Sequence, residues 1–384
     1  MKQLYEIHNI RYPPFEPARW IPSSLPIATQ HHERGEFASR EDAMKAMTSM
    51  NPSFKLGTNN AWFLERSFSY DGEDLAVEQK GPVLESEPFV DAVQHQRTGW
   101  YLVPSPIHNI IRQFINGVVL VLLGALFYLF VSPLMLALGL PVYGLETVRW
   151  GLLDYPALAV FVVPLIFAPL LVRVFANLLE LRRQNAFLAS NPRRPLLQIE
   201  QKPVANQPLV LSVNFPKMNP QWNHVDVFWR VGILPPSREV LLQELGRDEH
   251  HQPPPGLSTE LPHHWIVGLD DGTAGGEDAP MEMQEVQGGL YLRPMRIMES
   301  GEHQRWEEGN QVVLQPPLGT WPGSVNTDLL RVHWGCILRI DRKKGGPLLW
   351  VEPLNVAHCT DAVSLEILPL HDGRSEMDIS LATH

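Results

Sequence analysis

Two long apolar stretches in the middle of the chain decide the fold: GVVLVLLGALFYLFVSPLMLALGL at Gly117–Leu140 and YPALAVFVVPLIFAPLLV at Tyr155–Val172. Neither stretch contains a charged residue. A helix needs roughly 20 apolar residues to cross about 30 Å of hydrocarbon. The first stretch is long enough, and the second becomes so if Arg173 snorkels to the surface and the helix continues to Leu179. The sequence therefore predicts an integral membrane protein with a two-helix transmembrane hairpin, its spans lying at about 115–139 and 155–179.

Four prolines lie within these stretches: Pro133, Pro156, Pro164 and Pro169. Each removes a backbone donor, and in lipid the freed carbonyl needs another partner. These prolines predict either simple helix kinks or close packing of the two spans against each other.

Basic residues near the ends of the spans predict the orientation. Arg112 precedes the first span, and the second is followed by Arg173, Arg182, Arg183, Arg193 and Arg194. The connecting segment 140–154 carries only Glu146, Arg149 and Asp154. We therefore expect a short external turn and both termini in the cytoplasm, in the inner or cell membrane. The segment after Met1 is broken by charge and proline and does not resemble a signal peptide, which agrees with this orientation.

Aromatic residues flank the spans as they do at membrane interfaces. Tyr143, Trp150 and Tyr155 suit the external interface, and Trp100 and Tyr101 suit the opposite one.

The overall charge of the 384-residue chain is −11, which argues against nucleic acid as the main partner, since a phosphate backbone is bound through clustered Lys and Arg. The basic segment 191–194 can either touch anionic lipid headgroups or only set the topology. The two cysteines, Cys336 and Cys359, are too few for a disulfide framework or a cysteine zinc site, and in a reducing cytoplasm they stay thiols. Cys336 alternates with apolar neighbours, which favours a small buried side chain.

Residues 1–108 are predicted to form a small α+β unit. A short strand at Leu4–Ile7 is followed by a proline-rich connection and by a helix that begins after Ser39 and stops at Asn51-Pro52. Ser39 and Asp42 have the spacing of a capping box. Ala61–Tyr70 and Leu75–Val83 look extended around a turn. Because its apolar content is modest, the unit is expected to need the membrane surface or the C-terminal domain for stability.

Residues 195–370 are predicted to form an all-β sandwich. The clearest strand is LRVHWGCILRI, in which Leu330, Val332, Trp334, Cys336, Leu338 and Ile340 face one way and Arg331, His333 and Arg339 the other. The same alternation marks Leu209–Phe215 and Val225–Val231. Further strand candidates are Leu196–Gln201, Trp265–Leu269, Gly289–Arg293, Gln311–Gln315 and Leu348–Val351. Residues 246–280 are expected to be a mobile insertion flanking one strand, and residues 371–384 a tail.

The order of these features resembles the arrestin-like superfamily, an immunoglobulin-like sandwich. The similarity is most specific in VVLQPPLGTWPGSVNTDLLRVHWGCILRID, where Pro317, Pro322 and Ser324 occupy a turn before a long alternating strand with Trp334 at its central aromatic position. It covers roughly Pro195–Val356. The chain departs from that superfamily in lacking room for a second sandwich and in its fusion to membrane spans, so receptor or phosphate-sensing roles are not carried over. The resemblance implies a non-enzymatic module that contacts proteins through sheet edges and loops.

Chemical motifs give little support to an enzyme. The pairs His31-His32, His250-His251 and His263-His264 lack metal-ligand spacing, because neighbouring residues on a strand point to opposite faces. His358-Cys359 is the only tempting nucleophile pair, and neighbours in sequence are seldom partners in space. Gly272–Gly276 lacks the lysine, strand and helix of a phosphate loop. We therefore predict no catalytic, cofactor or metal site, although a titratable cluster converging in a pocket of the sandwich would revive an enzymatic interpretation.

The sequence thus favours a membrane-anchored interaction protein, with a hairpin at 109–183 that tethers the soluble parts near the inner leaflet. Its expected partners are the bilayer and a protein that the sequence does not identify, and a homo-oligomer is possible. The alternative is an accessory subunit of a membrane transport or secretion complex.

Overall fold

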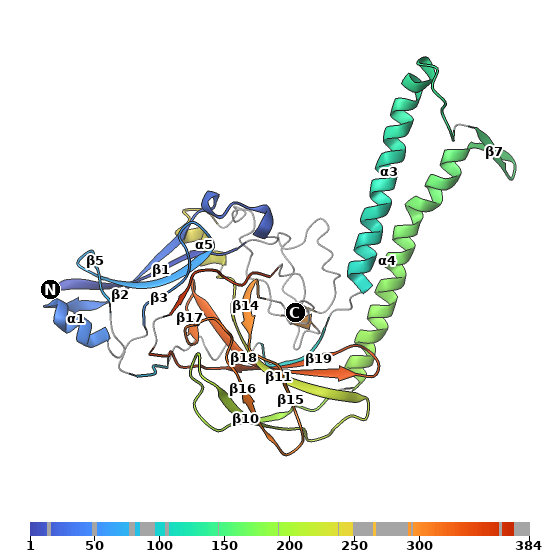
Figure 1. Ribbon diagram of the computed structural model, residues 1–384. Helices are drawn as coiled ribbons and strands as arrows, with labels where there is room; N and C mark the ends of the chain where they lie inside the picture. The colour runs from blue at the N-terminus through green and yellow to red at the C-terminus, as the bar shows by residue number, and fades with distance from the viewer. Residues whose placement is uncertain are drawn as a thin grey trace. The chain divides into compact units, whose positions relative to one another are not determined.

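A computed structural model describes residues 1–13, 17–47, 52–76, 81–84, 97–103, 107–144, 146–190, 192–236, 238–248, 264–265, 291–292, 295–360 and 363–371 (Figure 1). The chain divides into two compact units. One is Ser105–Asn191, and the other combines Met1–Pro104 with Pro192–His384.

The first unit is an antiparallel helical hairpin. α3 spans Ile107–Ala137 and α4 spans Ala157–Ser190, with Pro133 inside the former and Pro164 and Pro169 inside the latter. Segments of 25 residues, Gln113–Ala137, and of 29 residues, Val162–Ser190, are long and apolar enough to cross a membrane. The segment between the helices holds a small hairpin of β7, Thr147–Trp150, and β8, Leu153–Pro156. The sequence predicted that Tyr155 and Pro156 begin the second helix. In the structure they belong to β8 instead.

The N-terminal residues of the second unit form an antiparallel sheet in the order β2-β1-β4-β3, closed by β20. Its strands are β1, Lys2–Arg11; β2, Ala28–Phe37; β3, Phe54–Gly57; β4, Phe63–Tyr70; and the short β5, Glu73–Asp74. Two short 3-10 helices, Pro17–Arg19 and Pro22–Ser24, lie in the proline-rich connection. Residues 77–80 of the stretch expected to be extended at Leu75–Val83 lie outside the described residues, and among the others only Val83 pairs, in an isolated bridge.

The predicted capping box is confirmed at α1, Arg40–Met47. The Asp42 amide donates to Ser39 Oγ at 3.2 Å, and that hydroxyl in turn donates to the Asp42 carboxylate at 2.7 Å. These bonds satisfy a backbone donor that a free helix end would leave open. The residues that lead to the predicted stop at Asn51-Pro52, 48–51, lie outside the described residues.

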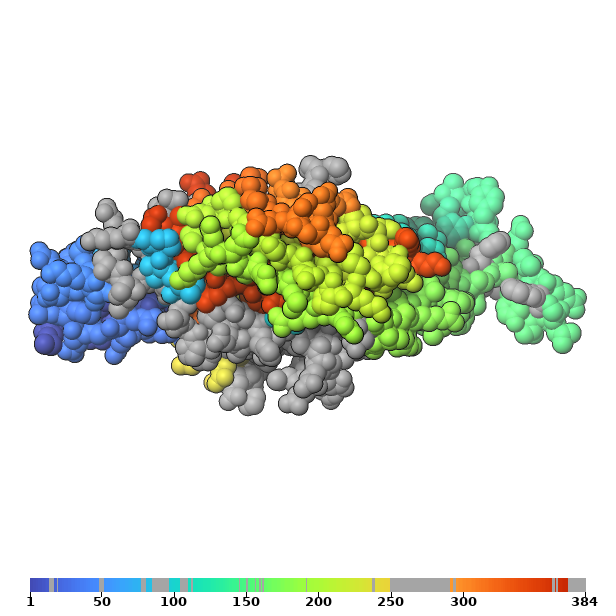
Figure 2. All heavy atoms as spheres, turned by 90° about the horizontal axis from the view of Figure 1, so that it is seen from below, coloured from blue at the N-terminus to red at the C-terminus, as the bar shows by residue number. Residues whose placement is uncertain are grey.

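The C-terminal residues form two antiparallel sheets. The larger has the order β14-β11-β18-β19-β6, with β15 and β17 pairing beside β11 and β18, and the smaller has the order β16-β10-β9. Their strands are β6, Gly99–Leu102; β9, Leu196–Ile199; β10, Leu209–Asn214; β11, Trp222–Ile233; β14, Ile297–Ser300; β15, Gln304–Arg305; β16, Gln311–Leu314; β17, Val325–Asn326; β18, Arg331–Arg342; and β19, Leu348–Leu354. On the face seen from below, the green-to-yellow segment with β10 and β11 lies against the orange segment with β14–β16 (Figure 2).

The central strand β18 is buried on both faces. The predicted inward face is confirmed, since Val332, Trp334, Cys336, Leu338 and Ile340 are all buried. The opposite face was expected to be exposed, yet Ile337 joins an apolar cluster with Tyr101, Phe228 and Met298, and His333 is only 8% exposed. The expectation of a one-sided strand was therefore wrong, because apolar side chains of the same sequence region, joined by Tyr101 of β6, cover the second face.

Strand exchange joins the N-terminal and C-terminal sequences into one unit. β6 precedes the helices but pairs with β19, which follows them, through the register Leu102 to Leu348. Conversely, β20, Ser364–Leu365, runs parallel to β3 in the N-terminal sheet. The hairpin is thus inserted within one interwoven unit. Two single hydrogen bonds reinforce the connection: Tyr12 Oη donates to the Ile233 carbonyl at 3.2 Å, and Arg296 Nη1 donates to the Pro13 carbonyl at 2.9 Å.

The predicted mobile insertion 246–280 lies mostly outside the described residues. Helix α5, Arg238–Glu244, precedes it, and the described pairs β12, His264–Trp265, and β13, Tyr291–Leu292, form a two-residue ladder. His250-His251, His263, Gly272–Gly276 and the tail 372–384 are outside the described residues as well.

Candidate functional site

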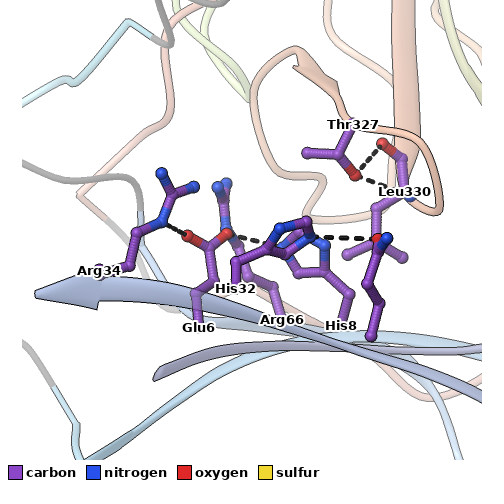
Figure 3. A network of polar contacts seen from close by, with 8 residues as sticks. Glu6, His8, His32, Arg34, Arg66, Thr327 and Leu330 are labelled. Carbon is purple, nitrogen blue, oxygen red and sulfur yellow. Dashed lines mark hydrogen bonds and ion pairs between the residues drawn. The ribbon is translucent and has the colours of Figure 1, made fainter. Parts of the chain in front are cut away.

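A cluster of charged and imidazole side chains occupies the buried face of the N-terminal sheet (Figure 3). Glu6 and His8 follow each other at a spacing of two on β1 and are 1% and 0% exposed. Since alternate residues of a strand share a face, they stand between the buried apolar residues Leu4 and Ile10. The sheet thus places ionisable groups where a core would normally be apolar.

Neighbouring strands bring the other members together. In the ladder, Glu6 lies opposite His32 of β2, and His8 lies opposite Arg66 of β4. The Glu6 carboxylate accepts hydrogen bonds from Arg66 Nε at 2.5 Å and Arg34 Nε at 2.5 Å. His8 Nε2 is 2.6 Å from the same carboxylate. Glu6 is therefore the centre of the cluster, held from three sides.

Burial and charge act in opposite directions on Glu6. Burial alone would raise the pKa of its carboxyl, but the hydrogen bond to His8 and the charges of Arg66 and Arg34 outweigh burial and lower the pKa below its usual value. Glu6 is accordingly an anion at neutral pH.

His8 is the neutral partner of that anion. Burial lowers the pKa of His8, although its hydrogen bond with Glu6 partly opposes this shift. A neutral imidazole that bonds a carboxylate through Nε2 must carry its proton there. Nδ1 is then an acceptor, and it has no hydrogen-bond partner among the described residues. The His8 and His32 rings lie 4.8 Å apart, and burial lowers the pKa of His32 too.

The turn between β17 and β18 lies over this face. Thr327 and Leu330 extend toward the cluster from the sandwich sequence, as Figure 3 shows. Thr327 Oγ1 accepts the Leu330 amide at 2.9 Å and so fixes the turn. The charge of Asp328, in the same turn, acts on His32. The turn therefore lies close enough to the cluster for its charge to act on His32.

The chemistry available to this cluster is restricted. It contains no Ser, Cys or Lys nucleophile, and its acid and base are shut away from solvent. No group of three His, Cys, Asp or Glu side chains in the described part of the chain could hold a metal ion. The arrangement fixes charges and orients strands. Sequence reasoning missed it, because Leu4, Glu6, His8 and Ile10 do not form an apolar alternation.

A second cluster lies where the chain passes to and from the helical hairpin. Trp100 Nε1, on β6 before α3, donates to the carbonyl of Arg193, which follows α4, at 3.3 Å. Arg194 Nη2 donates to Glu352 Oε1 at 2.7 Å, and its guanidinium lies 5.6 Å from the Trp350 ring centroid. These contacts fasten the outgoing and returning chain to β19.

Trp100 and Tyr101 have different surroundings, although both were expected at a membrane interface. Trp100 is partly exposed, whereas Tyr101 is 3% exposed and packs in the core. Successive side chains on β6 point to opposite faces, so the assignment of Tyr101 to the interface was wrong.

The remaining predicted residues have structural roles. His358 is fully buried and accepts the Gly323 amide at Nδ1, 3.0 Å away. Cys336 and Cys359 are both buried, as predicted for Cys336. Ser324 of the quoted turn donates to the Leu354 carbonyl at 3.1 Å, and Trp334 Nε1 donates to the Pro322 carbonyl at 2.9 Å. His31 is exposed, and His32 contributes to the Glu6 cluster.

Comparison of the chain with protein-family models, curated proteins and solved structures found no match. The resemblance to the arrestin-like superfamily stays a prediction.

Proposed function

We propose that the protein is a membrane-anchored interaction module, in which the α3–α4 hairpin tethers the interwoven soluble unit near the inner leaflet with both termini in the cytoplasm. The observation that carries this proposal is the insertion of the hairpin between β6 and β9. The soluble unit is attached at two places, β6 ending at Leu102 before α3 begins at Ile107, and α4 ending at Ser190 before β9 begins at Leu196. Two short attachments restrict its movement more than one flexible linker would.

Exposed sheet edges are the surfaces we assign to protein partners. β2 ends the N-terminal sheet and carries Glu33, Arg34 and Glu36, charges that discourage indiscriminate pairing. β9 ends the smaller sheet and is less protected, since Leu196 is 53% and Ile199 38% exposed. An extended peptide can add to such an edge through backbone hydrogen bonds. Tethering raises the effective concentration of the module toward other membrane-bound proteins, so weak contacts suffice.

The second candidate function is an accessory subunit of a transport or secretion complex. It is favoured by the large apolar side chains that α3 and α4 leave exposed, among them Phe130 at 83% and Phe127 at 69%. Lipid covers such side chains equally well, so the helices alone do not decide between the two functions.

Hairpin exchange distinguishes them. Residues 107–190 are replaced by an unrelated two-span hairpin, and a second version carries the native hairpin alone. Proximity labelling and detergent-resistant co-purification are compared among the three proteins. If the protein is an interaction module, the same partner proteins should be labelled and co-purified after hairpin replacement, and they should be lost when only the native hairpin is present. The opposite pattern would contradict it and support the accessory subunit. Protease cleavage of a C-terminal tag in inverted vesicles, but not in spheroplasts, checks the orientation.

A further inference from the structure

One end of the sandwich combines basic side chains with a row of tryptophans. We call it the junction surface and define it by Arg193, Arg194, Lys343, Lys344, Trp100 and Trp222. The side chains of Arg193, Arg194, Lys343 and Lys344 are exposed, and those of Trp100 and Trp222 are partly exposed. The rings form a row, with 5.3 Å between the centroids of Trp350 and Trp100 and 5.9 Å between those of Trp100 and Trp222. Arg194 is paired with Glu352, so Arg193, Lys343 and Lys344 supply the positive charge of this surface in a chain whose net charge is −11.

Hydrogen bonds hold the basic β18–β19 turn beside the chain that leads into α3. Arg342 Nε donates to the Gly346 carbonyl at 2.6 Å, which closes the turn. The Lys343 amide donates to the Gln221 carbonyl at 2.9 Å, next to Trp222. The Val103 amide donates to the Pro347 carbonyl at 3.4 Å. Lys343 and Lys344 thus belong to a fixed structure at the end of β6.

Chain connectivity limits how far this surface can be from a bilayer. Four residue steps separate Val103 from Ile107, which is at most about 14 Å. With Arg112 at the hydrocarbon boundary, the helical residues from Ile107 to Arg112 rise about 8 Å, close to the depth of one headgroup layer. Electrostatic attraction extends about another 8 Å at physiological salt. Because about 14 Å is the limit for a fully extended connection, any more compact path brings Lys343 and Lys344 of the β18–β19 turn within reach of headgroup charge.

The chemistry of the surface selects the ligand. Tryptophan rings favour the boundary between water and lipid, and Lys and Arg favour anionic headgroups. We propose that the junction surface docks on anionic phospholipid headgroups and so fixes the orientation of the soluble unit on the membrane. This inference rests on the membrane anchoring proposed above, and it adds a second, lipid-dependent contact to the two helices.

The test uses the full chain reconstituted in vesicles of phosphatidylcholine alone or mixed with phosphatidylglycerol. A fluorophore is attached through Gln221→Cys, an exposed position beside the turn, and through Lys45→Cys on α1 as the comparison site. The native cysteines are buried and do not compete for the label. Quenching by a nitroxide on the lipid headgroup reports proximity to the membrane. Docking predicts strong quenching at position 221 that requires phosphatidylglycerol and is relieved by high salt.

Charge removal tests the residues themselves. Lys343→Gln with Lys344→Gln should reduce the ratio of docked to undocked protein by roughly 30-fold, because each surface lysine contributes about a factor of 5. Lys45→Gln with Lys202→Gln removes two exposed charges elsewhere and should leave quenching unchanged. Equal quenching with and without phosphatidylglycerol, or equal quenching at positions 221 and 45, would overturn the docking proposal. Flotation after alkaline carbonate treatment separates the anchoring proposal from the docking proposal. A protein that no longer floats with the vesicles refutes both. A protein that floats but shows no quenching refutes only the docking.

Discussion

Replacing Glu6 by Gln tests whether the buried cluster holds the soluble unit together. The substitution preserves shape but removes the charge that three donors share, with Arg66 and Arg34 Nε atoms each 2.5 Å from the carboxylate. Arg66 is 1% exposed and cannot turn toward water. Loss of one partner from a buried pair destabilises proteins by about 3–5 kcal/mol, because the other charge is left uncompensated.

The value for Glu6→Gln should lie near the lower end, about 3 kcal/mol. The Arg34 side chain is 34% exposed and can move into solvent when its partner is lost. Arg34→Gln should therefore be mild, at about 1 kcal/mol or less, and Arg66→Gln severe. The expected order of destabilisation is Glu6 and Arg66 well above Arg34.

Equilibrium unfolding in detergent, followed by tryptophan fluorescence, measures these free energies, and the double variant Glu6→Gln, Arg66→Gln completes a cycle. Because the two residues share one interaction, the double variant should be more stable than the sum of the single effects predicts, by about 1–3 kcal/mol. The reasoning is refuted if Glu6→Gln lies within about 0.5 kcal/mol of the wild type, which is the range of ordinary surface substitutions.

Four further outcomes are expected. Acidification should destabilise the protein below about pH 6.5, because the pKa of His8 is lowered in the fold and the unfolded chain binds the proton first. The lowered pKa of Glu6 adds a further loss of stability below about pH 4.5. In a profile of stability against pH, His8→Asn should flatten the part between these two pH values. Gly57→Ala should lower the thermal unfolding midpoint far more than Gly72→Ala. Both glycines have φ near +80° (81° and 82°), but only at Gly57 would the new Cβ meet a backbone atom, the Trp62 carbonyl oxygen at 2.0 Å. Equal effects of the two substitutions would mean that backbone strain, and not this contact, decides the loss of stability. Burial raises the pKa of the Cys336 thiol, so a maleimide should label Cys336 only under unfolding conditions, and rapid labelling of the native protein would contradict its burial. Trp334→Leu should lower the free energy of unfolding by about 3 kcal/mol or more, because it removes packing on Trp229 and the hydrogen bond to the Pro322 carbonyl. An unchanged unfolding midpoint in a denaturant titration would contradict this role of Trp334.

Local patterns in the sequence predicted those elements that are determined by residues close together in the chain. The apolar stretches predicted both long helices, the spacing of Ser39 and Asp42 predicted the start of α1, and the alternation around Trp334 predicted β18. At α1 and β18 the side chains that form the pattern also make the stabilising contacts.

Elements that depend on distant partners were not predictable in this way. β20 is two residues long and exists because β3 lies beside it, and β6 is completed by β19. β2 carries many polar residues on an edge, which hides its periodicity, and α5 was missed within a sequence that looked uniformly β. The burial of Ile337 likewise depends on residues distant in sequence, among them Tyr101 and Met298.

The Glu6 cluster shows the same limit at the level of a site. Its members come from three strands and face a turn of the sandwich, and no local spacing connects Glu6 with Arg66 or His32. Only the register of β1 with both neighbours brings their charges together.

Strand exchange also bears on how the chain is made. Leu102 leaves the ribosome before either long helix, whereas its ladder partner Leu348 follows both. The N-terminal sheet likewise waits for Ser364 and Leu365. During synthesis from the N-terminus, the helical hairpin is therefore completed while both sheets still lack strands. The exposed strand edges need protection until the last strands have been synthesised. With the membrane anchoring proposed above, this topology implies a fixed order of biogenesis, in which the hairpin inserts first and the interwoven unit folds last.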